Sequence, residues 1–505
     1  MVGIFFDYAA KLKKNAGFLL IVILIDDGNF YLNLEDPIIM KASKSLKRLQ
    51  RKREKRNHES KIKQKLNRIN KQKGENVVFH LFKTINHCFP DLIERIRQIE
   101  DCRKRSDYQL VELIMACIAM SIFKADSRNA FNNQRQEENF KDNYQKIFKL
   151  RLPHMDTVDN VMRQINPDEL QRLKTRLIRT LLEKKTFHKF RLFKKFFIIA
   201  VDGTGLMKFS KRHCEHCLTK TSKKGKVTYF HHVLEAKLIC PNGFAISIAT
   251  EWIENPEGDF DKQDCEMKAF PRLAEKIKKM FPRLPICITA DGLYPNQTFF
   301  SICKLNHWSF IVTFKDGNLP SVWQEVRILR EMTSDNKYQQ TIFRKQKKIK
   351  CDYTWLNDID YLSFQLNWLE CIETIEGPGS EKTTRFVHVT DLKVDRSTTA
   401  TISQTARLRW KIENEGFNTQ KNQGYNLKHK FSRTSLTAAK NYYQCIQIAH
   451  LINQLSILST TFQQLLSSKI TIKHLWKCMS SFLLHAIIDP NEIDMISKLR
   501  IQVRF

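Results

Sequence analysis

Apolar residues recur every three or four positions between about residues 75 and 190, a spacing that predicts amphipathic helices. The segments DYQLVELIMACIAMSIF and DELQRLKTRLIRTLLEKK are the clearest examples. Asn166 followed by Pro167 is a strong helix start, so two helices joined by a tight turn are expected there. Such a pair resembles a helix-turn-helix, although most helical hairpins only pack a core. We interpret residues 75–190 as a helical, DNA-binding domain.

The next region has short apolar runs separated by turns, a pattern typical of buried strands. FFIIAVDGTG predicts a strand that ends at Asp202, and AKLIC and FAISIATEWI around the turn PNG predict a hairpin. A helix is expected over residues 262–280, and PICITADGLY predicts a strand that ends at Asp291, before a short helix and the strand WSFIVTF. Three antiparallel strands, a crossover helix and two more strands predict a ribonuclease-H-like sheet over residues 191–319.

Residues 320–400 have a different, strand-rich pattern. Three segments, YQQTIFRKQKKIKCDYTWL, FQLNWLECIETIEG and TTRFVHVTDLKV, predict successive strands joined by polar turns. Helical spacing returns over residues 401–505. The predicted fold class is therefore mixed α/β: a ribonuclease-H-like core with a β-strand-rich insertion, flanked by helical N-terminal and C-terminal regions.

The charge balance is strongly basic, with 85 Lys and Arg against 53 Asp and Glu and a formal net charge of +32. Such a field favours polyanions, nucleic acid above all. Between Lys41 and Lys73 the acidic residues are only Glu54 and Glu59. We interpret residues 1–74 as a basic arm that contacts DNA phosphates; the alternative is a solvated helix or a disordered arm.

The chain has one long apolar run, Phe18–Ile25, which is much shorter than the roughly 20 residues of a membrane span. We therefore expect no membrane partner. The 13 cysteines lack the dense, regular spacing of a disulfide scaffold, which favours a reducing compartment. A cytoplasmic protein, associated with the nucleoid when bound to DNA, fits these features.

Two aspartates follow predicted buried strands, each immediately before a glycine. Asp202 and Asp291 would lie near each other if their strands are neighbours in one sheet. Paired carboxylates suit two Mg²⁺ or Mn²⁺ ions and phosphoryl-transfer chemistry. A single aspartate before glycine more often caps a turn, but two on matching strands favour a metal site.

A third carboxylate is expected on a helix that returns to this sheet. The segment LRWKIENEGFN contains two candidates, Glu413 and Glu415. Residues two positions apart on a helix point in roughly opposite directions, so these two glutamates cannot hold the same ion. Helical geometry alone does not rank them.

Taken together, these motifs resemble the DDE transposases of bacterial insertion sequences, in the subgroup with a β-rich insertion before the final glutamate. The resemblance covers about residues 100–425. It rests on VDGTG, HCEHCLTK with TYFHH, KQDCEMKAF, TADGLYPN and VTDLKVDRSTTATISQTARLRWKIENEGFNTQKN. It implies that Asp202, Asp291 and one glutamate bind two Mg²⁺ or Mn²⁺ ions. It also implies cleavage of double-stranded DNA at transposon ends and transfer of the 3′-hydroxyl into target DNA by a homodimer on paired ends.

The family's final motif, Arg-Trp-x-x-Glu, matches Arg409, Trp410 and Glu413 and so ranks Glu413 above Glu415. The resemblance also implies that Arg409, Trp410 and a lysine contact the DNA. The family has its lysine seven residues after the glutamate, where this chain has Gln420 followed by Lys421, and a tyrosine where this chain has Ala406. These departures keep Glu415 as an alternative catalytic residue. On a regular helix, Gln420 and Lys421 would share one broad face with Glu413.

Three further features of the sequence give weaker indications of function. The pair Cys214 and Cys217 has the spacing of a zinc knuckle and lies among histidines, but with no second such pair we prefer packing or a DNA-facing role to zinc. Glu266 begins the expected crossover helix, where an acid suits the helix dipole, and the resemblance suggests a supporting role near the site. We expect the tryptophans to lie mostly in the core, although one beside the cut could stack on a flipped base. The candidates are Trp252, Trp308 and Trp410.

Two other functions stay open at this point. One is a non-catalytic DNA-binding protein derived from a transposase, which would keep the fold and the basic surface. The other is a nuclease that cleaves DNA without transferring strands.

Overall fold

A computed structural model describes residues 73–333, 335–344, 347–377, 380–466 and 470–498 of the chain. The predicted basic arm of residues 1–74 lies outside the described residues except for Lys73 and Gly74, which begin the first described helix. The apolar run Phe18–Ile25 also lies outside them. Residues 72–505 group into one compact unit, and the following description concerns that unit.

Helices dominate the part before the sheet, as the apolar spacing predicts. They are α3 (Lys73–Cys88), α4 (Leu92–Arg97), α5 (Leu110–Ile122), α6 (Arg128–Gln136), α7 (Glu138–Phe148), α8 (Met155–Met162), α9 (Pro167–Glu183) and a 3₁₀ turn (His188–Phe190). Helix α5 is apolar nearly all round and is buried along its whole length, as expected of a central helix. Its one charged residue, Glu112, is neutralised by Arg151 at 2.9 Å.

The predicted helix start before α9 is confirmed. The Asn166 side chain accepts a hydrogen bond from the Asp168 amide at 3.0 Å, and Pro167 occupies the first turn. The apolar face of α9 is buried against β4 (Ala245–Ile253) and α15 (Leu436–Ile457). The hairpin of α8 and α9 therefore helps to build the core, and DNA contact by this region stays a prediction.

Residues 197–313 form the first half of a mixed sheet. Its elements are β1 (Phe197–Phe209), β2 (Leu218–Thr221), β3 (Val227–Ile239), β4, α10 (Glu266–Met280), β5 (Ile286–Ala290), α11 (Gln297–Asn306) and β6 (Ser309–Thr313). Strand β3 pairs antiparallel with β1 on one side and with β2 and β4 on the other. After the crossover helix α10, β5 lies parallel to β1, and β6 lies parallel to β5.

The sequence predicts that strand β1 ends at Asp202. In the structure this strand continues to Phe209. The reason is its pairing with β3, which extends past Asp202 and tolerates an irregularity between Gly205 and Lys208. The parallel pairing of β1 with β5 does stop early, at Ala200 opposite Thr289. Asp202 thus lies beyond the parallel pairing of β1 with β5 but within the antiparallel pairing of β1 with β3.

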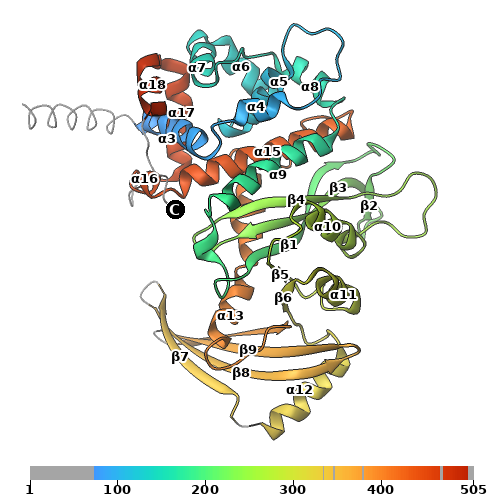
Figure 1. The fold of residues 1–505 in the computed structure, drawn as a ribbon. Coiled ribbons are helices and arrows are strands. Elements are labelled where there is room, and N and C mark those ends of the chain that lie inside the picture. The colour runs from blue at the N-terminus through green and yellow to red at the C-terminus, as the bar shows by residue number, and fades with distance from the viewer. Residues whose placement is uncertain (1–72, 334, 345–346, 378–379, 467–469, 499–505) are drawn as a thin grey trace, which may run out of the picture. The chain divides into compact units, whose positions relative to one another are not determined.

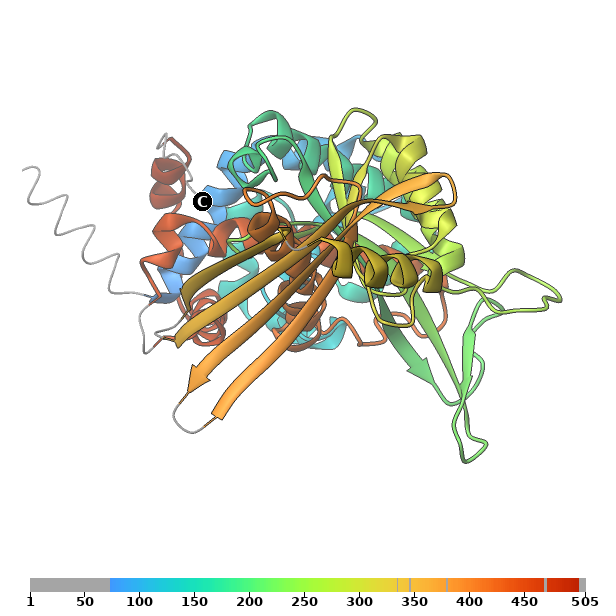
Figure 2. The same ribbon diagram turned by 90° about the horizontal axis from the view of Figure 1, so that it is seen from below.

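The strands predicted between residues 320 and 400 are present, together with one helix that was not predicted. This insertion consists of α12 (Pro320–Met332), β7 (Lys337–Arg344), β8 (Lys347–Tyr361), β9 (Phe364–Gly377) and β10 (Ser380–Thr390). These strands do not form a separate sheet. Strand β10 pairs antiparallel with β6, so the order β1-β5-β6-β10-β9-β8-β7 runs through one sheet of ten strands in the described chain (Figures 1 and 2).

Helical structure returns after β10. It comprises α13 (Thr399–Arg407), a π-helix (Ile412–Asn418), α14 (Thr419–Asn422), α15, α16 (Thr460–Gln463), α17 (Ile472–His485) and α18 (Pro490–Lys498). Helix α15 packs against α5 and α9, and α17 packs against α3 (Figure 1). The two helical regions that flank the sheet in sequence are therefore neighbours in space. None of the described helices is long and apolar enough to cross a membrane.

Candidate active site and metal cluster

The two predicted aspartates lie at equivalent positions of neighbouring strands. Phe197 of β1 is paired with Ile286 of β5, an offset of 89 positions, and Asp202 and Asp291 are separated by the same offset. Each aspartate comes two residues after the last parallel pair, Ala200 and Thr289. Because adjacent strands are about 4.8 Å apart, this register brings the two carboxylates to the same end of the same pair of strands.

The third predicted carboxylate meets Asp202 through a shared arginine. The Arg409 guanidinium lies 2.8 Å from Glu413 Oε1 and 3.7 Å from Asp202 Oδ2. Arg409 is itself largely buried, whereas the Glu413 side chain is half exposed. A cationic group thus stands between two of the three candidate ligands, where it offsets their mutual repulsion.

Asp202 is in an environment that disfavours its charged form. The pKa of Asp202 is raised to about 7, mainly by burial; Arg409 lowers it, and the nearby carboxylates of Glu413 and Glu266 raise it. The carboxylate also accepts a hydrogen bond from the Gly203 amide at 3.0 Å. Burial and neighbouring like charges are the combination expected where a cation would be bound.

Glu266, at the start of α10, comes close to this site because Gly203 has no side chain. A Cβ atom at Gly203 would lie 2.1 Å from Glu266 Oε1 and 2.7 Å from His232 Nε2. His232 on β3 in turn lies 3.4 Å from Glu266 Oε1. The glycine that follows Asp202 therefore leaves room for a fourth carboxylate and a histidine. A side chain at this position of the VDG motif would collide with both.

Tyr294 is a site residue that sequence reasoning missed. Its side chain is buried, and its hydroxyl has no hydrogen-bond partner among the described residues. Burial raises its pKa, and the negative charges of Glu266, Asp202 and Asp291 raise it further. The only available sequence signal was its position three residues after Asp291 in TADGLYPN.

The π-helix over Ile412–Asn418 determines which of Gln420 and Lys421 lies on the side of Glu413. A regular helix would bring Gln420 to the face of Glu413, but the π-helix over Ile412–Asn418 adds one residue to the turn. Lys421 Nζ accordingly donates to Thr204 Oγ1 on β1 at 2.6 Å. The expectation that Gln420 shares this face is wrong. Its side chain is buried and bonds Gln447 at 2.8 Å and His450 at 3.1 Å.

Two side chains donate hydrogen bonds to backbone carbonyls of the π-helix. Thr419 Oγ1 donates to the Asn414 carbonyl at 3.1 Å, and Gln454 Nε2 donates to the Glu415 carbonyl at 3.4 Å. Gly416 lies inside this stretch, where a Cβ would come within 3.1 Å of the Lys237 side chain. The sequence around Glu413 therefore contains both the space and the hydrogen bonds that a π-helix needs.

Glu415, the alternative glutamate, faces elsewhere. It forms an ion pair with Lys411 at 2.8 Å, and it is not among the groups that shift the pKa of Asp202. Glu413 is therefore the glutamate that the structure brings beside Asp202, as the family motif ranks it.

Trp410 does not lie in the core. Its side chain is 49% exposed and contacts the ring of Phe386 edge-on at 6.2 Å, whereas Trp252 and Trp308 are buried as expected. An exposed indole next to Arg409 is available to a ligand.

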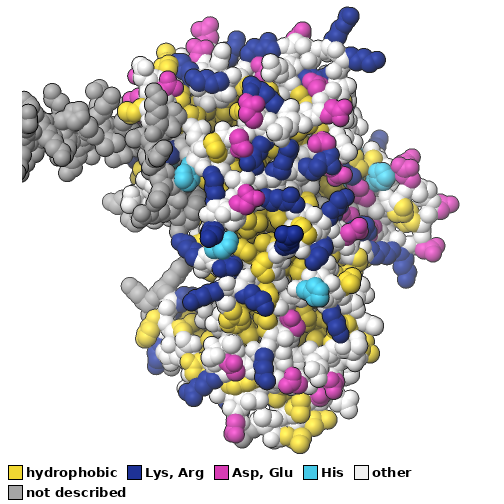
Figure 3. Space-filling view, in the orientation of Figure 1, with side chains coloured by type: hydrophobic (Ala, Val, Ile, Leu, Met, Phe, Trp, Pro, Cys, Tyr) yellow, Lys and Arg dark blue, Asp and Glu magenta, His cyan; other side chains and the backbone are white. Residues whose placement is uncertain are grey.

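Basic side chains gather beside the carboxylates. Burial lowers the pKa of Lys421, and Lys428 and Lys208 lower it further, while Asp202 and Glu413 raise it. Lys430 Nζ lies 4.5 Å from the ring centroid of Phe209, at the end of β1. Figure 3 shows Lys and Arg side chains spread over one face of the molecule, from the helices at the top to the strands of the insertion at the bottom. Mutually repelling lysines of this kind favour binding of an anion.

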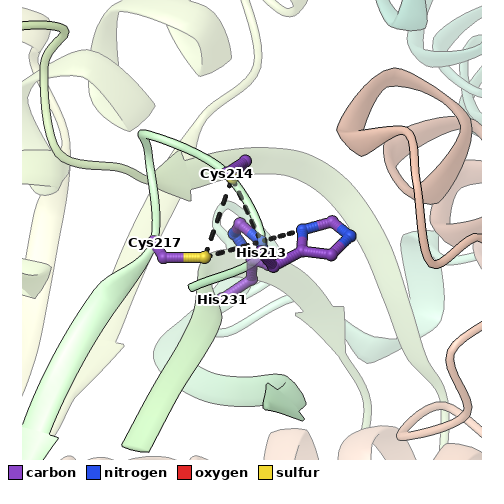
Figure 4. Close-up of side chains that lie close together, drawn as sticks. All are labelled: His213, Cys214, Cys217 and His231. Atoms are coloured by element: carbon purple, nitrogen blue, oxygen red, sulfur yellow. Dashed lines mark hydrogen bonds between the residues drawn. The ribbon is translucent and has the colours of Figure 1, made fainter. Parts of the chain in front are cut away.

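A second cluster lies at the far end of β1. The side chains of His213, Cys214, Cys217 and His231 converge, with all four potential ligand atoms within 4.8 Å of one another (Figure 4). Burial lowers the pKa of His231 to about 4, so its ring is neutral at physiological pH. In the described part of the chain this is the group already close enough to hold a metal ion, and Asp202, Asp291 and Glu413 do not form one as tight.

Comparison with known proteins adds no assignment. No known protein family matches the chain, and no curated protein matches it.

Proposed function

We propose that this protein is a DNA transposase of the DDE type. It would cleave double-stranded DNA at transposon ends and transfer the freed 3′-hydroxyl into target DNA. The strand order β4-β3-β1-β5-β6, with three antiparallel strands followed by a crossover helix and two parallel strands, supports a ribonuclease-H-like core. In this interpretation the insertion β7–β10 extends the same sheet between the second aspartate and the glutamate.

The observation that carries the proposal is the meeting of Asp202 and Glu413 at one guanidinium, that of Arg409. These two carboxylates are far apart in sequence, and one lies on a strand while the other lies on a helix. The shared register of Asp202 and Asp291 adds the third carboxylate. A buried acid with a pKa near 7 that has two acidic neighbours is unfavourable for folding alone, and such sites are usually functional.

The residues fit the divalent ions that the proposed chemistry needs. Carboxylate oxygens are the ligands that Mg²⁺ and Mn²⁺ prefer, and the same carboxylates raise the pKa of Tyr294, whose buried hydroxyl has no hydrogen-bond partner among the described residues. Asp202, Asp291 and Glu413 would hold two such ions. Bound there, they would supply positive charge that acidifies the attacking water or 3′-hydroxyl and neutralises charge that develops on the phosphate.

The chain's own side chains would then bind and orient the DNA. Arg409 is hydrogen-bonded to Glu413 at 2.8 Å, and a phosphate could replace that carboxylate as the partner of the guanidinium once Glu413 turns to a metal ion. Lys421, fixed against Thr204, would contact a neighbouring phosphate. The exposed Trp410 ring would stack on a base near the cut.

The proposed partners are two transposon ends and a target duplex. A homodimer on paired ends is part of the proposal, because both ends must be cut and joined together. The net charge of +32 and the lysines around Lys421 suit a long DNA path, which predicts steeply salt-dependent binding.

The test uses the full-length chain with labelled duplexes from the two flanks of its own coding segment. With Mg²⁺, the proposal predicts both nicked ends and products in which an end is joined to a target plasmid. Nicking without joining would instead indicate a nuclease. Specific binding without nicking, in Mg²⁺ and in Mn²⁺, would indicate a non-catalytic DNA-binding protein.

A further inference from the structure

Four of the six distances among the ligand atoms of His213, Cys214, Cys217 and His231 are those of a tetrahedral metal site, and the other two, from His213 to the two sulfurs, are at most 4.8 Å. The two sulfur atoms are 3.7 Å apart, His231 Nε2 is 3.6 Å from each sulfur, and it is 3.4 Å from His213 Nδ1. Zinc bonds of about 2.3 Å to sulfur and about 2.0–2.1 Å to nitrogen require edges near 3.8, 3.6 and 3.3 Å in a tetrahedron. Each of the four measured edges agrees with its expected value to about 0.1 Å.

The alternatives to a metal do not account for this geometry. A disulfide needs a sulfur separation of about 2.05 Å, much shorter than the 3.7 Å between Cys214 and Cys217. Simple apolar packing would not bring two imidazole nitrogens and two thiols to one point. Two further ring nitrogens, Nε2 of His213 and Nδ1 of His231, are buried without a hydrogen-bond partner among the described residues. Two buried rings whose polar contacts in the described chain are only with each other and with the thiols are best explained by a shared ligand.

Neighbouring residues hold the ligands in place. Asn255 donates through Nδ2 to the Cys217 carbonyl at 2.9 Å, and its own carbonyl lies 3.0 Å from His216 Nδ1. The ring of His213 stacks on Phe209 at 4.3 Å. His216 is therefore engaged by the backbone and is not a ligand, although the sequence offers it equally.

We propose that these four side chains bind one structural Zn²⁺ ion. Zinc is the metal that a closed set of two thiolates and two imidazoles selects. The site joins the loop between β1 and β2 to strand β3. The loop provides His213, Cys214 and Cys217, the last of which directly precedes β2, and β3 provides His231. All four ligands come from this chain, so the site is complete without a partner and has no open position for a substrate.

The role of the ion follows from what it holds. Strand β2 has only four residues and pairs only with β3 among the described strands. The hairpin of β2 and β3 extends from the rest of the sheet, and its turn, which includes Lys223, Lys224 and Lys226, is exposed (Figure 2). A two-stranded hairpin without a core is marginally stable in water. The zinc ion would fix the base of this basic hairpin on the strand that bears Asp202.

Metal content of the full-length chain tests the proposal without DNA, so the result does not depend on the proposed function. The protein should contain one zinc per chain by mass spectrometry after purification without chelator. Cys217→Ser and His231→Ala should each reduce zinc to trace levels. His216→Ala and Cys265→Ser are matched controls, because they remove a histidine and a cysteine that do not belong to the cluster, and both should keep one zinc.

Cobalt replacement keeps the test informative if a variant folds poorly. The Co²⁺ form should show the visible bands of a tetrahedral ion and a thiolate charge-transfer band, which ions at the carboxylate site cannot produce. His231→Cys should still bind the metal, with a stronger charge-transfer band from three sulfurs. Folded wild-type protein that takes up no zinc when supplied with ZnCl₂ would overturn the proposal. So would retention of zinc by both Cys217→Ser and His231→Ala.

Discussion

Lys421 Nζ lies 2.6 Å from the hydroxyl oxygen of Thr204, two residues beyond Asp202 on β1. This contact depends on the π-helix that precedes Lys421, since a regular helix would present Gln420 instead. The widened turn thus places a lysine beside Asp202 and leaves the glutamine in the core.

Replacing Lys421 should therefore impair DNA cleavage, whereas replacing Gln420 should impair stability. Lys421→Ala should reduce DNA cleavage roughly 10–100-fold, the worth of one charged hydrogen bond of about 1.5–3 kcal/mol, with little change in stability. Gln420→Ala should lower the free energy of unfolding by about 1–3 kcal/mol, because Gln447 and His450 each lose a buried hydrogen bond. Urea unfolding and a nicking assay on the same preparations separate the two effects. A Lys421→Ala variant that unfolds while Gln420→Ala is as stable as wild type would refute the assignment.

The two glutamates of the RWKIENE segment give a matched pair. Glu413→Gln should lower the cleavage rate at least about 100-fold, because a metal ligand contributes several kcal/mol of transition-state stabilisation. Glu415→Gln removes only the partly exposed ion pair with Lys411, worth about 1 kcal/mol or less, so activity should stay within a few-fold of wild type. Equal losses in single-turnover cleavage would contradict the ranking.

Asp202 makes stability depend on pH in a specific direction. Its pKa in the folded chain is about 7, above its ordinary value of 3.8, so between these values the folded chain holds a proton that the unfolded chain has released. The stabilising effect is therefore complete below pH 4 and is lost as the pH rises through 7. Asp202→Asn mimics the protonated form and should become more stable than wild type as the pH rises from 5 to 8, by at most about 4 kcal/mol.

Thermal unfolding at a series of pH values without divalent metal measures this effect. Asp142→Asn, an exposed carboxylate on α7, is the control and should differ from wild type by a constant amount. Adding Mg²⁺ should stabilise wild type at pH 8 but not Asp202→Asn. If the difference in stability between Asp202→Asn and wild type did not change with pH, the pKa of Asp202 would not be raised in the folded chain.

Trp410 should contribute to DNA binding and very little to the stability of the fold. Its exposed indole makes one edge contact with Phe386, so Trp410→Ala should change the free energy of unfolding by less than about 1 kcal/mol. Loss of a stacked base should weaken binding of cleaved ends by about 1–3 kcal/mol. Trp410→Phe keeps an aromatic face and should retain most of the affinity. Fluorescence anisotropy with nicked duplexes checks both, and an alanine variant that binds like wild type would exclude stacking.

Gly203 offers a test of the crowding around Asp202. A methyl group there would displace Glu266, whose carboxylate oxygen lies 2.1 Å from the position of the added atom. Gly203→Ala should therefore reduce cleavage, and Glu266→Gln combined with it should add little further loss, since both remove the same interaction. Losses that simply multiply would show that Glu266 and Gly203 act independently.

The sequence predicts those parts of the fold that local patterns determine. Apolar runs locate the strands β1, β4, β5 and β6, and the Asn-Pro start locates α9, because burial and capping act within a few residues. It misses the extension of β1 past Asp202 and the fusion of the insertion with the sheet. Both depend on pairing with strands far away in sequence, β3 and β6.

The candidate site divides in the same way. Asp202, Asp291 and Glu413 could be named from motifs, and the strand register and Arg409 support their grouping. Tyr294, the π-helix and the pairing of His213 and His231 with the two cysteines could not. No local pattern distinguishes His213 from His216, and only the fold brings His231 to Cys217.

The proposed function requires that Asp202, Asp291 and Glu413 together support divalent-metal-dependent cleavage of DNA. The most direct measurement is release of a 3′-hydroxyl at the ends of the chain's own element by wild type, Asp291→Asn and Asp142→Asn, with binding of the same DNA measured in parallel. Asp291→Asn should bind like wild type and yield no product in Mg²⁺ or Mn²⁺, while Asp142→Asn should cleave normally. Cleavage by Asp291→Asn at the wild-type rate would refute the proposed role of the three carboxylates.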